Sequence, residues 1–131
     1  MLFQSFHSQE ERRAFAGSDF IELQYCKLKQ GTKIKEIVSV NQIENWKDDS
    51  LYVSGDHMDP FFSSYSSIFN KGIYNNGASG IVDLFGINYY APEQTDLMIE
   101  QLRERNSADD QVLLSWLKCA RNFNGFYVLG V

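Results

Sequence analysis

The sequence predicts an α/β (α+β) domain in which a mixed β-sheet, beginning with an N-terminal hairpin, is packed by C-terminal helices. Three observations predict this class. The 131 residues are enough for one domain, residues 1–131, with its own core. Period-two alternation near the start indicates strands. Two segments with helical apolar spacing near the end precede a strongly apolar run, which is typical of helices packed on a sheet.

The first forty residues predict a short helix and then the hairpin. Ser8 and Glu11 have the spacing of a capping box, and Gly17 limits the helix to about two turns. Residues 20–26 and 34–40 both alternate apolar and polar positions on either side of a glycine turn, as two paired strands do. The lysines of this region fall on polar positions, so we expect one face of the hairpin to be solvated and basic.

The middle of the chain is less regular. Residues 51–53 predict a short strand. In residues 59–69, Asp59 matches an N-cap and Pro60 the first helical position, and apolar residues recur at helical spacing. We therefore favour a helix there over an extended segment. Residues 74–80 contain an Asn-Gly pair and predict a loop, because both residues tolerate positive φ.

The last fifty residues show the clearest patterns. Residues 81–90 predict a strand that is bulged at Gly86. A helix is expected from Pro92, because acidic residues follow it and arginines stand near the far end of the segment. Ser107 and Asp110 have capping spacing for a second helix, whose wide apolar face is expected in the core with Trp116.

The run at residues 126–131 is almost wholly apolar and predicts a strand buried on both faces. Cys26 and Cys119 stand far apart without the spacing of a metal or redox motif, so we expect neither a metal nor another cofactor. The start of the chain lacks the pattern of a signal peptide, and no apolar run of about 18 residues occurs. These observations favour a cytoplasmic protein without a membrane partner.

Charge argues against direct nucleic-acid binding. The formal net charge is −5, and residues 41–131 carry most of the acidity. Binding to phosphates needs a basic stripe, which this composition does not provide. One polar cluster, Asp56, His57 and Asp59, has residue types that could serve a small metal-dependent hydrolase. Its spacing matches no established ligand pattern, so a capped turn is the simpler interpretation. Another carboxylate, Asp83, interrupts an apolar segment and is expected to face solvent.

Two segments resemble small bacterial immunity proteins that are encoded beside polymorphic or contact-dependent inhibition toxins. They are residues 86–95, Gly-Ile-Asn-Tyr-Tyr-Ala-Pro-Glu-Gln-Thr, and residues 124–131, Asn-Gly-Phe-Tyr-Val-Leu-Gly-Val. The resemblance covers roughly the last third of the chain and carries over no catalytic residue. It implies a cytoplasmic protein that binds one cognate toxin domain and blocks it. Many such toxins are basic nucleases, and an EndoU-type ribonuclease is the candidate here.

The sequence therefore predicts a non-enzymatic inhibitor that acts by protein-protein contact. Negative charge facing a basic nuclease groove raises the association rate, and aromatic side chains hold the complex. Residues that combine charge or aromatic area with expected loop positions are the predicted toxin contacts: Asp48, Asp49, Asp56, Asp59, Tyr65 and Tyr89. The alternatives are the metal-dependent hydrolase using Asp56, His57 and Asp59, and a non-catalytic interaction subunit of a larger assembly.

Overall fold

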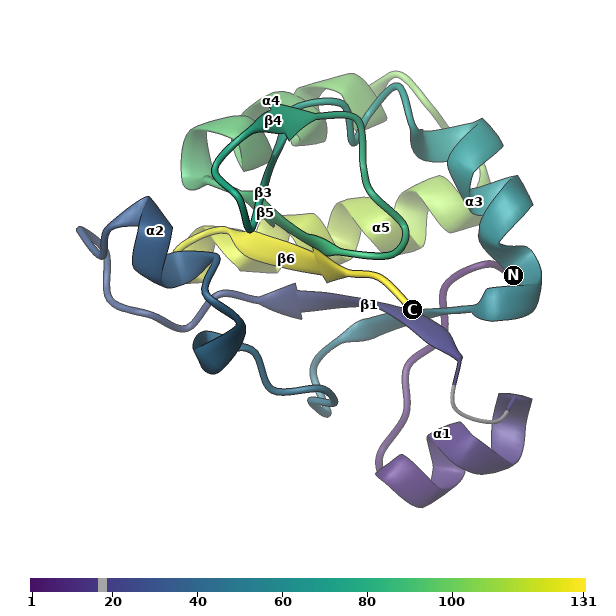
Figure 1. The fold of residues 1–131 in the computed structure, drawn as a ribbon. Coiled ribbons are helices and arrows are strands. Elements are labelled where there is room, and N and C mark those ends of the chain that lie inside the picture. The colour runs from purple at the N-terminus through teal and green to yellow at the C-terminus, as the bar shows by residue number, and fades with distance from the viewer. Residues whose placement is uncertain (17–18) are drawn as a thin grey trace.

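The computed structural model describes residues 1–16 and 19–131. Within these ranges the strands form one six-stranded sheet in the order β2-β1-β6-β5-β3-β4 (Figure 1). Each described pairing is antiparallel. The strands are β1 (Phe20–Tyr25), β2 (Leu51–Ser54), β3 (Gly72–Tyr74), β4 (Ser79–Gly80), β5 (Ile87–Tyr90) and β6 (Phe126–Leu129). The α-helices are α1 (Gln9–Ala16), α2 (Ile34–Ile37), α3 (Met58–Tyr65), α4 (Pro92–Arg103) and α5 (Ala108–Cys119).

Helices α3, α4 and α5 cover one face of the sheet and enclose the main core. Leu23 and Val128 project from the central strands into a cluster that contains Leu102 and Leu117 of the helices. Aromatic rings contribute much of the contact: Tyr25 stacks on Trp116 of α5 with ring centroids 4.1 Å apart. Burial of such rings supplies a large share of the stability of a small domain.

The opposite face of the sheet is also covered. Its central cluster joins Cys26, Tyr89 and Tyr127 to Ile37 of α2. The Tyr127 hydroxyl donates a hydrogen bond of 2.7 Å to the Ile37 carbonyl oxygen, which fastens α2 to the sheet. Toward α1, a second cluster contains Phe6, Phe20 and Tyr52. Because both faces are covered, every residue of β1 is buried.

The predicted α+β class and the packing of C-terminal helices on a sheet are confirmed, but the N-terminal hairpin was wrong. Residues 34–37 form helix α2, and β1 pairs with β2 and β6 instead. The apolar residues Ile34, Ile37 and Val38 fit helical spacing as well as alternation, and the last two are buried. The sheet is antiparallel in the described pairings, not mixed, and the expected solvated face of 20–26 is covered.

Several local predictions are confirmed and others need correction. Pro92 opens α4, and Ser107 and Asp110 form the expected capping box of α5. Asp59 lies in the first turn of α3 and does not cap it, since that helix begins at Met58. The expected strand over 81–90 is shorter, because residues 83–86 form a turn before β5. The expected helix stop at Gly17 lies outside the described residues.

Candidate interaction surface

One end of the sheet gathers exposed carboxylates. Because neighbouring strands are antiparallel, β1 and β5 begin at this end, whereas β2 and β6 finish there. The segments that flank these four strand ends bring distant parts of the sequence together. We call this region the acidic end and define it by its exposed carboxylates and the apolar side chains among them: Asp19, Asp56, Asp59, Asp83, Met58, Phe85 and Val131.

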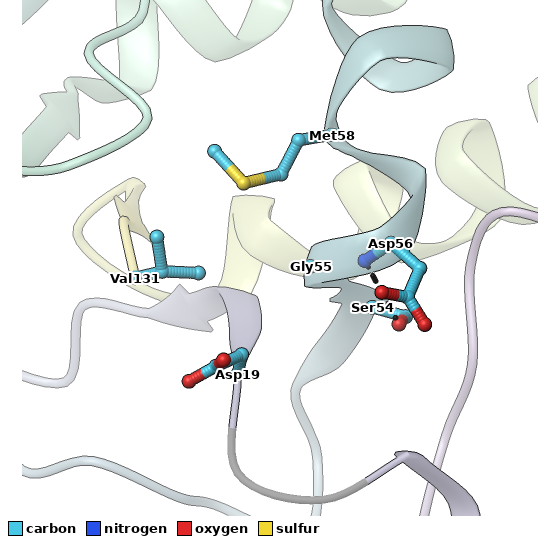
Figure 2. Close-up of a pocket in the computed structure, with 6 residues that line it drawn as sticks. All are labelled: Asp19, Ser54, Gly55, Asp56, Met58 and Val131. Carbon is cyan, nitrogen blue, oxygen red and sulfur yellow. Dashed lines mark hydrogen bonds between the residues drawn. The ribbon is translucent and has the colours of Figure 1, made fainter.

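A shallow hollow of about 370 Å³ lies at the acidic end (Figure 2). Met58 and Val131 supply its apolar lining, and Asp19 and Asp56 supply carboxylates. Gly55 allows the close approach of the two strand ends, since its amide donates a 2.7 Å hydrogen bond to the Asp19 carbonyl oxygen. A Cβ atom at Gly55 would stand 3.1 Å from that oxygen, so a larger residue would require a small shift of the Asp19 backbone.

The carboxylates of the acidic end have no cationic partner in the part of the chain that the structure describes. The ion pairs of the described residues, such as Lys27 with Asp49 and Arg121 with Asp96, do not involve these carboxylates. The segment that follows β1 at the opposite end of the sheet carries four exposed lysines: Lys27, Lys29, Lys33 and Lys35. The two ends of the strands therefore differ: cations lie among the carboxylates at one end, and none pairs with the described carboxylates of the acidic end.

A hydrogen-bonded turn at residues 83–86 borders the acidic end. The side chain of Asn88, which is fully buried, accepts a 2.8 Å hydrogen bond from the Asp83 amide and donates a 2.8 Å bond to the Asp83 carbonyl oxygen. The Asp83 carboxylate accepts a 2.9 Å bond from the Phe85 amide. The turn is thus fixed from inside, whereas the Phe85 side chain is 73% exposed. Asp83 faces solvent, as predicted.

The same turn is joined to the end of β6. The Leu84 carbonyl oxygen accepts a 3.0 Å hydrogen bond from the Val131 amide, and the Gly86 carbonyl oxygen accepts a 2.8 Å bond from the Gly130 amide. A Cβ atom at Gly130 would stand 2.4 Å from the Leu84 oxygen, so a glycine permits this approach. These contacts join the turn that carries Phe85 to Val131, which lines the hollow.

The predicted contact residues Asp48 and Asp49 lie at the other end of β2. The four-residue strand that separates them from Asp56 spans roughly 10 Å. The Asp49 carboxylate pairs with Lys27 at 2.7 Å, and its backbone oxygen accepts a 2.8 Å hydrogen bond from the Trp116 indole. Asp48 is exposed. The structure therefore divides the four predicted acidic contacts into two pairs and brings only Asp56 and Asp59 to the acidic end.

Tyr65 and Tyr89 do not offer the exposed aromatic area for which they were chosen, and that expectation was wrong. Each side chain is 1% exposed. The Tyr65 hydroxyl donates a 2.8 Å hydrogen bond to Asp110, and the Tyr89 hydroxyl donates a 2.8 Å bond to the Asn124 carbonyl oxygen. Burial raises the pKa of both phenols above its ordinary value. Both rings therefore belong to the core.

The alternative metal site does not assemble. Among the described residues, no group of three or more His, Cys, Asp or Glu side chains is arranged to hold a metal ion. Asp56 and His57 lie in a single 3₁₀ turn, Gly55–His57, and Asp59 lies in the following helix, each facing solvent. The amide of Asp56 bonds to the Ser54 hydroxyl at 3.2 Å, so this segment forms the capped turn that was the simpler interpretation.

Sequence reasoning missed a buried carboxylate on β1. Glu22 is 3% exposed, and its oxygens accept hydrogen bonds from the Trp46 amide at 2.8 Å, the Ser50 hydroxyl at 2.7 Å and the Gln24 side chain at 3.1 Å. A buried carboxylate needs such partners. Its alternation with Ile21 and Leu23 is the pattern of a solvated face, so the sequence carried no signal that the 43–50 segment covers it.

These features define a class: an α+β protein with one antiparallel sheet between helical layers and an acidic, partly apolar surface at one end of its strands. No family model, no curated protein and no solved structure matches this chain. Within the described ranges, no helix has both the length and the apolar character that crossing a bilayer requires.

Proposed function

We propose that this chain is a bacterial immunity protein, a non-enzymatic inhibitor that binds one cognate toxin domain stoichiometrically. The observation that carries the proposal is the acidic end, where exposed carboxylates without cationic partners among the described residues lie at the same strand ends as apolar side chains. An apolar centre with a charged rim is the usual composition of a protein-protein interface. The resemblance to immunity proteins supplies the kind of partner.

The proposed partner is a basic nuclease domain, with an EndoU-type ribonuclease as the candidate. A nuclease groove must attract phosphates, so its surface potential is positive. The carboxylates of the acidic end attract such a groove at long range and orient the chain as it approaches. The same negative charge repels nucleic acid and supports an inhibitor that contacts the enzyme and not its substrate.

A cytoplasmic setting belongs to the same proposal. Cys26 is a free buried thiol and Cys119 a free exposed thiol. Free thiols persist in the reducing cytoplasm, where disulfides are rare. The toxin that such a protein neutralises would act on cytoplasmic nucleic acid, so the inhibitor and its target would meet in one compartment.

The test is to express this chain together with the product of the gene immediately upstream of its own, where the proposal expects the toxin gene, and to purify the pair. We expect a 1:1 complex, and we expect nuclease activity to fall linearly to its end point at one equivalent of the chain. Stoichiometric loss distinguishes tight inhibition from turnover. The variant Leu97→Ala is a matched surface control, because Leu97 is 56% exposed on α4 and lies outside the acidic end.

Two results would contradict the proposal. The first is wild-type chain that neither binds the toxin domain nor protects cells that produce it. The second is purified chain that hydrolyses a small substrate by itself, with activity lost on His57→Ala, since this would restore the hydrolase alternative.

A further inference from the structure

We infer that the 83–86 turn is the apolar anchor of the inhibitory interface, and that its partner is a protein pocket lined by apolar groups and bordered by lysine or arginine. This inference rests on the proposed function and assigns its contact surface. It identifies Phe85 as the residue that inserts into the toxin domain. Asp83 and the other carboxylates of the acidic end would meet the basic border of that pocket.

Phe85 is unusually exposed for an apolar residue. Its side chain is 73% exposed, the largest exposed fraction among the large apolar residues of the described chain. The neighbouring Leu84 packs against the main core, so the turn already has its own apolar attachment without the Phe85 ring. Moving the apolar surface of a phenyl ring out of water is favourable. Binding a partner would remove that exposed area.

Hydrogen bonds fix the backbone of the 83–86 turn. The Asn88 side chain makes two hydrogen bonds of 2.8 Å to the Asp83 backbone, and the Asp83 carboxylate accepts a 2.9 Å hydrogen bond from the Phe85 amide. The Leu84 and Gly86 carbonyl oxygens are bonded to the end of β6 at 3.0 and 2.8 Å. A pre-organised loop loses little backbone entropy on binding. An aromatic residue on such a loop has the properties of an interface hot spot.

The charge around the turn selects the partner. Asp83 lies two residues from Phe85, and Asp19 and Asp56 line the hollow at the same end of the sheet. A second copy of this chain would present the same carboxylates at a symmetric contact, and like charges would repel. Anionic lipids and nucleic acids would be repelled as well. A basic protein surface with an apolar pocket is the complementary partner.

The test uses the purified product of the adjacent toxin gene as the probe and follows binding to immobilised wild-type, Phe85→Ala and Leu97→Ala chains. We expect Phe85→Ala to dissociate at least about 30-fold faster than wild type, the effect of losing an aromatic anchor. Its association rate should stay within about twofold, because its charge is unchanged. Leu97→Ala should bind as wild type does. Because both side chains are exposed, the three melting temperatures should agree.

A second variant separates anchoring from attraction. Asp83→Asn retains the oxygen that accepts the Phe85 amide but removes one charge. We expect slower association at low ionic strength and little change in dissociation. If wild type binds and Phe85→Ala dissociates no faster than Leu97→Ala, the anchor is overturned while the proposed function stands. If wild type does not bind the toxin domain, the proposed function is overturned, and this inference with it.

Discussion

At the residue scale, Asp110 shows how one carboxylate can join three segments of the chain. It is 4% exposed, and its oxygens accept hydrogen bonds from the Tyr65 hydroxyl at 2.8 Å and the Ser107 amide at 3.1 Å. Arg105 pairs with it at 3.1 Å. Burial opposes ionisation, but hydrogen bonds from Ser107 and Tyr65 and the charge of Arg105 outweigh it, so the pKa of Asp110 lies below its ordinary value. The ionised carboxylate therefore stabilises the fold.

This depressed pKa gives a pH-dependent prediction. The stabilisation by Asp110 is complete above the pKa of the unfolded chain, about 3.9, and is lost as the pH falls through the lower folded pKa. We expect Asp110→Asn to lower the free energy of unfolding by about 1–3 kcal/mol at pH 7. The difference from wild type should shrink below pH 4. Urea denaturation at pH 7 and pH 3 measures this difference in unfolding free energy, with the exposed Asp48→Asn variant as control. A difference that does not depend on pH would contradict the prediction.

Trp116 gives the second residue-scale prediction. It is 8% exposed, its ring stacks on Tyr25 and its indole donates a 2.8 Å hydrogen bond to Asp49. Trp116→Ala removes this packing and leaves a cavity, so we expect a loss of about 3–5 kcal/mol in the free energy of unfolding. Thermal and urea denaturation measure it. An unchanged melting curve would show that the helix face is not part of the core.

At the scale of elements, α1 contacts the sheet through the Arg12 cation, and Phe15 of the same helix packs on Phe6 with ring centroids 5.5 Å apart. The Arg12 guanidinium carbon lies 5.4 Å from the ring centroids of Phe20 and Tyr52 and 5.7 Å from that of Trp46. The neighbouring residues of the helix, including Arg13, are exposed. Cation-π contacts that are partly desolvated contribute about 1–2 kcal/mol. The helix is therefore expected to open locally more readily than the central strands.

We expect Arg12→Ala to release α1 while leaving the sheet intact. The amides of residues 9–15 should exchange with solvent about tenfold faster, and those of β1 and β6 should be unaffected. Hydrogen-deuterium exchange measures both regions in one experiment. Arg13→Ala is the matched control, because it removes an equal charge from the exposed side of the same helix. Equal exchange in the two variants would show that Arg12 does not hold the helix.

At the scale of the whole molecule, the antiparallel sheet brings carboxylates from distant segments to one end of its strands. Its strand ends place Asp19, Asp56 and Asp59 together, while the segment after β1 carries lysines at the other end. From the sequence alone, neutralising Asp48, Asp49, Asp56 and Asp59 together was expected to slow association with the toxin. The structure divides that set, because Asp49 is paired with Lys27 and lies away from the acidic end.

We therefore expect two sets of charge variants to behave differently toward the same toxin domain. Neutralising Asp19, Asp56 and Asp59 to asparagine should slow association about tenfold at low ionic strength and flatten its salt dependence. Neutralising Asp48 and Asp49 should have a smaller effect. Stopped-flow association between 20 and 300 mM salt measures both, an interval in which the Debye length falls below about 10 Å. If neutralising Asp48 and Asp49 slowed association more, the interface would lie at the opposite end of the sheet.

The local predictions that succeeded depend on neighbouring residues. The sequence determined where α4 and α5 begin, because Pro92 and the Ser107–Asp110 box act on the adjacent backbone. The sequence also determined the chain's acidity, which is a matter of composition. It determined the apolar helix face that buries Trp116 as well, because helical periodicity is a property of the local sequence.

Only the tertiary structure decided which segments pair and which faces are covered. Residues 34–37 satisfy two periodicities, and the choice of helix follows from β1 already having β2 and β6 as neighbours. Tyr89 and Glu22 have the sequence context of exposed strand residues, yet segments distant in the chain bury both. The acidic end could not be predicted for the same reason: strand direction and register bring Asp19, Asp56 and Phe85 together, and pairing between distant segments is not encoded in local spacing.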